Sequence, residues 1–199
     1  MAFDFKSFFR GLVGDAKTEV KKTAQAAGAA AAAKTETVSA PSLPKNVAEM
    51  TAMSEFDRKD PYKVAFFTIA ALCRFPESRD DCYAMINALK GPEPISNMNK
   101  EFIRDRFMDG KDYVPRSYFV GATPANDYTT SAPYKVEIIE QSNSRENAGY
   151  IRLWITSGGA DSPRLIVLRQ KPSTGEWFLN QFEFLLGDIR IPKSKDKWA

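Results

Sequence analysis

The chain has 199 residues, of which 43% are hydrophobic and 12% aromatic, so it can bury the core of one domain and still carry extensions. Its 28 basic and 25 acidic residues give a net charge of +3, and the basic residues are scattered along the sequence. Proteins that bind nucleic acid concentrate lysine and arginine on one face. We therefore expect no nucleic-acid partner.

The side-chain inventory excludes several kinds of site. The sequence has no histidine, the commonest general base and transition-metal ligand. Two cysteines, Cys73 and Cys82, cannot close a zinc site without histidine, and both lie in apolar helical patterns that predict buried free thiols in a reducing compartment. We expect no metal site, no cofactor and no catalytic residue, so an enzyme is the less favoured interpretation.

The sequence lacks a membrane-spanning stretch and a secretory signal, and these two features predict where the protein is located. The longest uncharged apolar stretch, residues 64–73, is too short to span a bilayer. The N-terminus is not a secretory signal, because Asp4, Lys6 and Arg10 interrupt any apolar region there. These features predict a cytoplasmic protein, either free or associated with a membrane or an assembly.

The opening stretch, "MAFDFKSFFRGLVGDAKTEVKK", predicts an amphipathic helix over residues 1–23. At 100° per residue, its apolar side chains fall on one face, and four basic residues line one flank of it: Lys6, Arg10, Lys17 and Lys21. We expect this face to dock on a partner. The docking residues are Phe5, Phe8, Phe9, Leu12 and Val13.

A change of composition separates this helix from the rest of the chain. Residues 24–33 are mostly alanine, and the sequence then turns to threonine, serine, proline and alanine. We interpret residues 24–54 as a flexible linker and residues 55–199 as the globular domain. A chain without residues 1–54 is then expected to fold by itself.

Three helices are predicted at the start of the globular domain. Asp60-Pro61 has the form of an N-cap followed by proline in the first turn, and it leads into "YKVAFFTIAALC". A second helix is expected from Ser78 to about residue 90, and a third begins after Ser96 and reaches about residue 110.

The connection after these helices, residues 111–133, is the main candidate for a binding site. It has no convincing periodicity, and compact domains seldom carry so long a connection without a function. Arg116, Tyr118, Asp127 and Tyr128 have the chemistry to line a pocket, with Asp127 as the best available carboxylate for acid–base work. The alternative is a packed loop whose aromatic side chains cover the end of the sheet.

Four strands are predicted next, at residues 134–140, 149–156, 164–171 and 176–182. Turn-rich segments join them, which favours an antiparallel meander. The predicted fold is therefore α+β, with three N-terminal helices packed on a four-stranded sheet and preceded by the amphipathic helix and the linker.

One of these turns, "SGGADSPR" at residues 157–164, has a second interpretation. Backbone N–H groups around its two glycines are able to form an anion-binding nest, to which Arg164 would add positive charge. A hairpin turn that uses glycine for its conformational freedom explains the same residues and is favoured.

Several segments carry a resemblance to a known family. "VAFFTIAALCRFPESRDDCYAMINALKGP", "DYVPRSYFVGATPANDYT", "GGADSPR" and "TGEWFL" together resemble an uncharacterised bacterial family, a domain of unknown function, over about residues 55–199. That resemblance implies a self-contained domain and no known activity. The order of elements, ending in "STGEWFLNQFEFL", is also similar to the cone-shaped nuclear-transport-factor-two-like fold, which implies a pocket between helices and sheet.

Three functions remain open. The leading hypothesis is a non-enzymatic adaptor held on a partner protein, an assembly shell or a second copy through residues 1–23, an arrangement that resembles bacterial encapsulation-peptide cargo. The first alternative is a peripheral protein on an anionic membrane surface. The second is a small-molecule binder or enzyme with a pocket under the 111–133 segment.

Overall fold

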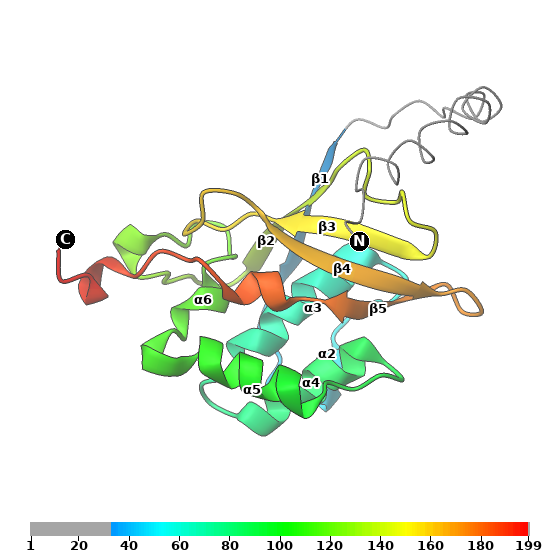
Figure 1. Cartoon of the computed structure of the whole chain (residues 1–199), viewed down its shortest axis with the longest axis horizontal. Helices are drawn as coiled ribbons and strands as arrows, with labels where there is room; N and C mark the ends of the chain where they lie inside the picture. The colour runs from blue at the N-terminus through cyan, green and yellow to red at the C-terminus, as the bar shows by residue number, and fades with distance from the viewer. Residues whose placement is uncertain (1–32, 199) are drawn as a thin grey trace, which may run out of the picture. The chain divides into compact units, whose positions relative to one another are not determined.

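A computed structural model describes residues 33–198 of the chain (Figure 1). The predicted helix of residues 1–23, with its docking residues, and the first part of the predicted linker lie outside the described residues. The described part has an α+β fold in which helices pack against an antiparallel sheet. The predicted fold class is therefore confirmed.

The sheet has five strands in the order β1-β2-β3-β4-β5, and every neighbouring pair is antiparallel. The chain thus forms the expected meander, in which each strand lies beside its predecessor. The four predicted strands are confirmed to within one residue at each end. They are β2 (Tyr134–Glu140), β3 (Tyr150–Ile155), β4 (Arg164–Lys171) and β5 (Glu176–Gln181).

The fifth strand corrects the prediction of a four-stranded sheet. β1 (Lys34–Ala40) lies inside the segment interpreted as linker and pairs with β2 along its whole length. Its sequence, "KTETVSA", looks like linker because β1 is an edge strand with only Val38 and Ala40 buried. The globular unit therefore begins near residue 33 rather than at residue 55.

The three predicted helices are present, and each begins at its predicted cap. They are α3 (Pro61–Cys73), α4 (Arg79–Lys90) and α5 (Asn97–Arg106). The Asp60 carboxylate accepts hydrogen bonds from two backbone amides of α3, and Ser78 accepts one from the amide of Asp81. Ser96 and Asn99 form a reciprocal capping box at the start of α5.

Two short helices were not predicted. One is α2 (Val47–Ala52), capped by Asn46, whose side chain accepts a hydrogen bond from the amide of Glu49 at 2.9 Å. The other is α6 (Tyr113–Arg116), which lies in the 111–133 segment. Four 3₁₀ turns complete the order of elements: η1 (Met108–Gly110), η2 (Pro124–Asn126), η3 (Glu183–Leu186) and η4 (Lys193–Lys195).

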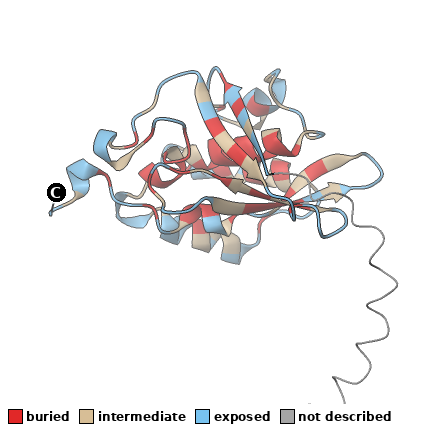
Figure 2. Cartoon of the chain, turned by 90° about the horizontal axis from the view of Figure 1, so that it is seen from above, coloured by how far each residue is buried: buried red, intermediate tan, exposed pale blue. Residues whose placement is uncertain are grey.

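The helices lie against one face of the sheet, with α3 in the middle (Figure 1). Eleven of the thirteen residues of α3 are buried, as its nearly uniform apolar sequence requires. In β2, β3 and β5 buried residues alternate with partly exposed ones, whereas β4 has three consecutive buried residues. Buried residues lie on strands and helices alike (Figure 2). On the other face, Ile139, Trp154 and Leu165 form a half-buried row across three strands.

Within residues 33–198, the helices are too short or too polar to cross a bilayer. Cys73 and Cys82 are both free thiols, as expected from the sequence. Burial raises the pKa of the Cys82 thiol to about 12, so this thiol stays protonated near neutral pH.

Candidate functional site

The two tyrosines predicted to line a pocket are buried and hold the chain's C-terminal segment. The Tyr118 hydroxyl donates to the carbonyl oxygen of Leu185 at 2.8 Å, and the Tyr128 hydroxyl donates to that of Arg190 at 2.6 Å. The Tyr128 ring also stacks on Tyr113, with 5.4 Å between the ring centroids. Both hydroxyl groups are therefore engaged in joining the 111–133 segment to residues 185–190.

The polar candidates also form hydrogen bonds or ion pairs within the protein. Asp127 has a left-handed backbone, and its carboxylate accepts a hydrogen bond from the amide of Ser194 at 2.9 Å. Arg116 pairs with Asp112 one helical turn earlier, at 2.8 Å. Arg164 donates to the carbonyl oxygens of Gly187 and Asp188 at 3.4 and 2.8 Å.

Four of the five candidates thus form hydrogen bonds with residues 185–194, whereas the ion pair of Arg116 is with Asp112. A surface hollow does lie beside the 111–133 segment. Its lining comprises Pro124, Ala125, Arg190, Ile191, Lys193 and Asp196 and includes none of the five candidates. The arrangement brings these residues together as contacts that fix loops, and it gives them no shared cavity at this hollow.

The glycines of "SGGADSPR" are explained by close packing. The Gly158 amide donates to the carbonyl oxygen of Ser117 at 2.9 Å, and the Gly159 amide donates to the Ser157 hydroxyl at 3.2 Å. A Cβ atom at Gly158 would collide with the carbonyl oxygen of Ala122. Both amides are used inside the protein, so this segment is a tight connection rather than an anion nest.

The buried tyrosines predict an alkaline transition. Burial raises the pKa of Tyr128 to about 12, and burial followed by a hydrogen bond to Glu140 raises that of Tyr62 to about 12. Unfolded tyrosines ionise near pH 10. Because the folded state favours the neutral phenol, this stability is fully present below about pH 10 and is lost as the pH rises toward 12.

Phenolate absorbance measured during an alkaline titration checks this prediction. We expect part of the signal to appear only above pH 10, together with loss of the near-ultraviolet circular dichroism. Tyr62→Phe and Tyr128→Phe should each reduce that late part. A single step near pH 10 for all seven tyrosines, with the fold intact, would contradict it.

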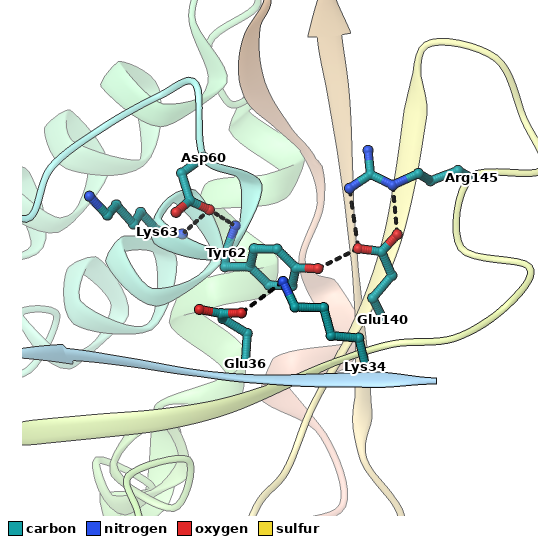
Figure 3. A network of polar contacts seen from close by, with 7 residues as sticks. All are labelled: Lys34, Glu36, Asp60, Tyr62, Lys63, Glu140 and Arg145. Carbon is teal, nitrogen blue, oxygen red and sulfur yellow. Dashed lines mark hydrogen bonds and ion pairs between the residues drawn. The ribbon is translucent and has the colours of Figure 1, made fainter. Parts of the chain in front are cut away.

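A polar network that sequence reasoning missed lies where β1 and β2 meet the start of α3 (Figure 3). The Tyr62 hydroxyl donates to the Glu140 carboxylate, and the Arg145 guanidinium donates to both oxygens of that carboxylate at 2.6 and 3.2 Å. Lys34 pairs with Glu36 at 2.9 Å, and its ammonium lies 4.9 Å from the centroid of the Tyr62 ring. The network ties both strands to α3.

The protonation states of this network suit a structural role. The hydrogen bonds from Arg145 are the main reason that the pKa of Glu140 is below its usual range, and they raise that of Arg145. Glu140 is therefore ionised and Tyr62 neutral near neutral pH. A carboxylate of low pKa is a poor general base, and a neutral phenol of high pKa is a poor nucleophile.

The orientation of the backbone in β2 determines which groups of β1 face outward. The amide of Val120 donates to the carbonyl oxygen of Lys135 at 2.8 Å, and that of Thr156 donates to Glu137 at 3.1 Å. The backbone C=O groups of Lys135 and Glu137 therefore point away from β1. Because backbone groups alternate in direction along an antiparallel strand, those of Val136, between them, point toward β1.

The register between β1 and β2 determines which backbone groups of β1 face β2. Val38 is paired with Val136, so its backbone groups point back toward β2. Those of Thr35, Thr37 and Ser39 consequently point to the outer edge of the strand. Within residues 33–198, β2 is the only strand that pairs with β1. The outer edge of β1 is free in this part of the chain.

A notch of about 310 Å³ runs beside the free edge. It is bounded by the middle of β1 and by the chain that enters α3. Its lining residues are Glu36, Thr37, Val38, Ser39, Ser54, Glu55, Asp60 and Lys63. Three of these side chains are acidic and one is basic, and because Lys34 pairs with Glu36, the notch keeps only a small net negative charge. We call the free edge and this notch the β1 edge site.

Together the fold and the site define an α+β domain whose antiparallel meander, within residues 33–198, ends in an open edge strand. A family model described as a domain of unknown function (DUF6935) matches residues 42–193, and the chain belongs to that family. The match begins just after β1. No curated protein and no solved structure matches the chain. The expected bacterial origin and the similarity to the nuclear-transport-factor-two-like fold stay predictions.

Proposed function

We propose that this protein is a non-enzymatic interaction module that binds an extended, basic segment of a partner protein along β1. The observation that supports the proposal is the outer edge of this strand, which no other strand of residues 33–198 covers. The N–H and C=O groups of Thr35, Thr37 and Ser39 can form the same ladder with a partner strand that β1 forms with β2. Main-chain hydrogen bonds of this kind supply affinity for many sequences.

The charge of the notch supports a basic partner. Side chains of an added strand alternate between the two faces of the sheet, so every second one would point toward the notch. Glu36, Glu55 and Asp60 outnumber Lys63 there. Lysine or arginine at those alternate positions would be favoured, and acidic residues would be repelled.

The predicted docking helix, residues 1–23, is a second contact in this proposal. Its phenylalanine face suits a groove on a partner protein or on an assembly shell. The proposed location is the cytoplasm. Self-association and binding to an anionic membrane are the competing outcomes.

A binding measurement with a defined probe tests the proposal. The probe is a short fluorescent peptide of alternating lysine and valine, titrated against the full chain and followed by anisotropy. Thr37→Pro removes an outward N–H group without removing a bond to β2, and edge strands tolerate proline. We expect this variant to bind roughly tenfold more weakly or worse, because the added strand loses a central hydrogen bond.

The matched control is Thr37→Val, which keeps the outward amide and should bind like the unchanged chain. A peptide of alternating glutamate and valine should bind more weakly than the lysine peptide. Equal binding of Thr37→Pro and Thr37→Val, with both variants folded, would refute docking on β1.

The contribution of the N-terminal segment is tested separately. Phe5→Ser with Phe9→Ser should weaken association with the partner, leave binding of the lysine–valine peptide to β1 unchanged, and leave the melting temperature the same. Sedimentation velocity of the full chain would reveal a self-associating protein, and co-sedimentation with vesicles that contain phosphatidylserine would reveal a membrane protein. Either result without peptide binding would replace the partner-protein proposal.

A further inference from the structure

A third hollow lies on the side of the sheet opposite to β1, between the end of α4 and the hairpin of β4 and β5. Its volume is about 260 Å³. The lining residues are Lys90, Pro92, Glu93, Arg169, Gln170, Lys171, Pro172, Phe178, Leu179 and Asn180. We call it the hairpin groove. It shares no lining residue with the β1 edge site.

Phe178 gives the groove a fixed apolar wall. Its ring rests on the backbone of Gly91, where a Cβ atom would lie 2.6 Å from the ring atom Cε1. The guanidinium of Arg58 lies 5.6 Å from the centroid of the same ring. The ring is therefore held in place before any ligand arrives, which lowers the entropic cost of stacking on it.

Three cationic side chains border the groove, against one acidic one. Lys90 donates to the carbonyl oxygen of Asn180 at 3.4 Å, which holds its ammonium beside β5. Arg169 is 4.0 Å from Glu93, and both side chains are more than half exposed, so their ion pair is weak. In the described residues no ion pair involves Lys171.

The end of α4 opposes an anion through its unpaired carbonyl groups, but that effect is reduced here. Arg58 donates to the carbonyl oxygen of Ala88 at 2.7 Å, and Lys90 adds positive charge in the last turn. Arg58 and Lys90 therefore offset the negative end of α4, and Arg169 and Lys171 remain to attract an anion.

We infer that the hairpin groove binds a small molecule that combines one aromatic ring with one anionic group, a carboxylate or a phosphate monoester. The ring stacks on Phe178, and the anion lies between Arg169 and Lys171. A cavity of ~150 Å³ accommodates benzene, whereas pockets for drug-sized ligands start at ~300 Å³. The groove thus matches a single ring with a charged substituent.

Nuclear magnetic resonance titration of the full chain tests this inference, with phenyl phosphate, inorganic phosphate and benzyl alcohol as probes. Phenyl phosphate should shift amide resonances at residues 90–93, 169–172 and 178–180. It should bind more tightly than either other probe, because only phenyl phosphate uses both the ring wall and the cations. Phe178→Leu should weaken phenyl phosphate without changing the weak binding of inorganic phosphate.

Arg169→Gln with Lys171→Gln should weaken phenyl phosphate by roughly tenfold, since two exposed charge-assisted contacts are lost. The matched control, Lys59→Gln with Lys135→Gln, removes the same charge from exposed positions elsewhere. Equal weakening by both pairs, shifts spread over the whole surface, or equal affinity for phenyl phosphate and inorganic phosphate would overturn the inference.

Discussion

A chain that begins at Glu55 is expected to lose its cooperative fold. It lacks β1 and α2, and with them the buried side chains of Val38, Ala40 and Met50. Losing this burial costs roughly 5 kcal/mol or more, which is comparable to the ~5–15 kcal/mol that stabilises a whole domain. Thermal unfolding followed by near-ultraviolet circular dichroism checks this result.

The matched control is a chain that begins at Ala33, which keeps every described element. It should unfold in one sharp transition. In the shorter chain the edge of the sheet becomes β2, whose sequence "YKVEIIE" is more apolar than β1, so we also expect aggregation. Cooperative unfolding of the chain from Glu55 at a similar temperature would contradict the place of β1 in the core.

The second large effect is expected from Gly158→Ala. The new methyl group would collide with the carbonyl oxygen of Ala122, and both groups belong to backbone held by neighbouring hydrogen bonds. Such overpacking costs roughly 3 kcal/mol, which lowers the melting temperature of a domain of this size by roughly 6–12 °C.

Gly187→Ala is the matched control, because its φ of −127° suits any residue and nothing lies within 4 Å of the new methyl group. It should change the stability by less than about 1 kcal/mol. If Gly158→Ala melts like Gly187→Ala, the close approach of residues 117–122 to residues 157–159 is wrong. Gly159→Ala should resemble Gly158→Ala, since its methyl group would meet Ile189 Cγ2 at 2.7 Å.

Most of the central fold could be predicted from the sequence because its signals are local. α3 begins at an Asp-Pro cap and is apolar nearly all round, and the helices α4 and α5 begin at serine caps. Among the four C-terminal strands, β2, β3 and β5 alternate, β4 is a short apolar run, and turn residues separate all four. Each of these features depends on neighbours within a few positions, so no knowledge of the tertiary contacts was needed.

β1 could not be predicted in the same way, because its pairing with β2 spans about a hundred residues of sequence. As an edge strand it buries few side chains and therefore lacks strong alternation. Its β-branched residues Thr35, Thr37 and Val38 were the available signal. For α2, the spacing of Asn46 and Glu49 was a cap signal that could have been used.

The candidate site residues of the 111–133 segment show why the sequence could not decide between a pocket and a packed loop. Aromatic and charged side chains in the 111–133 segment are equally suited to line a pocket or to hold the C-terminal segment, and the difference depends on where residues 185–195 lie. The Tyr62–Glu140–Arg145 network likewise joins residues far apart in sequence. The hairpin groove requires the register of β4 and β5, which no local pattern contains.

Amide hydrogen exchange in β1, resolved by residue, tests the proposed function most directly. In the free chain, the amides of Thr35, Thr37 and Ser39 should exchange fast, whereas those of Glu36 and Val38 should be protected by β2. The alternating lysine–valine peptide should slow the three outward amides and leave the hairpin groove unchanged. Outward amides that exchange equally fast with and without the peptide would contradict docking on β1.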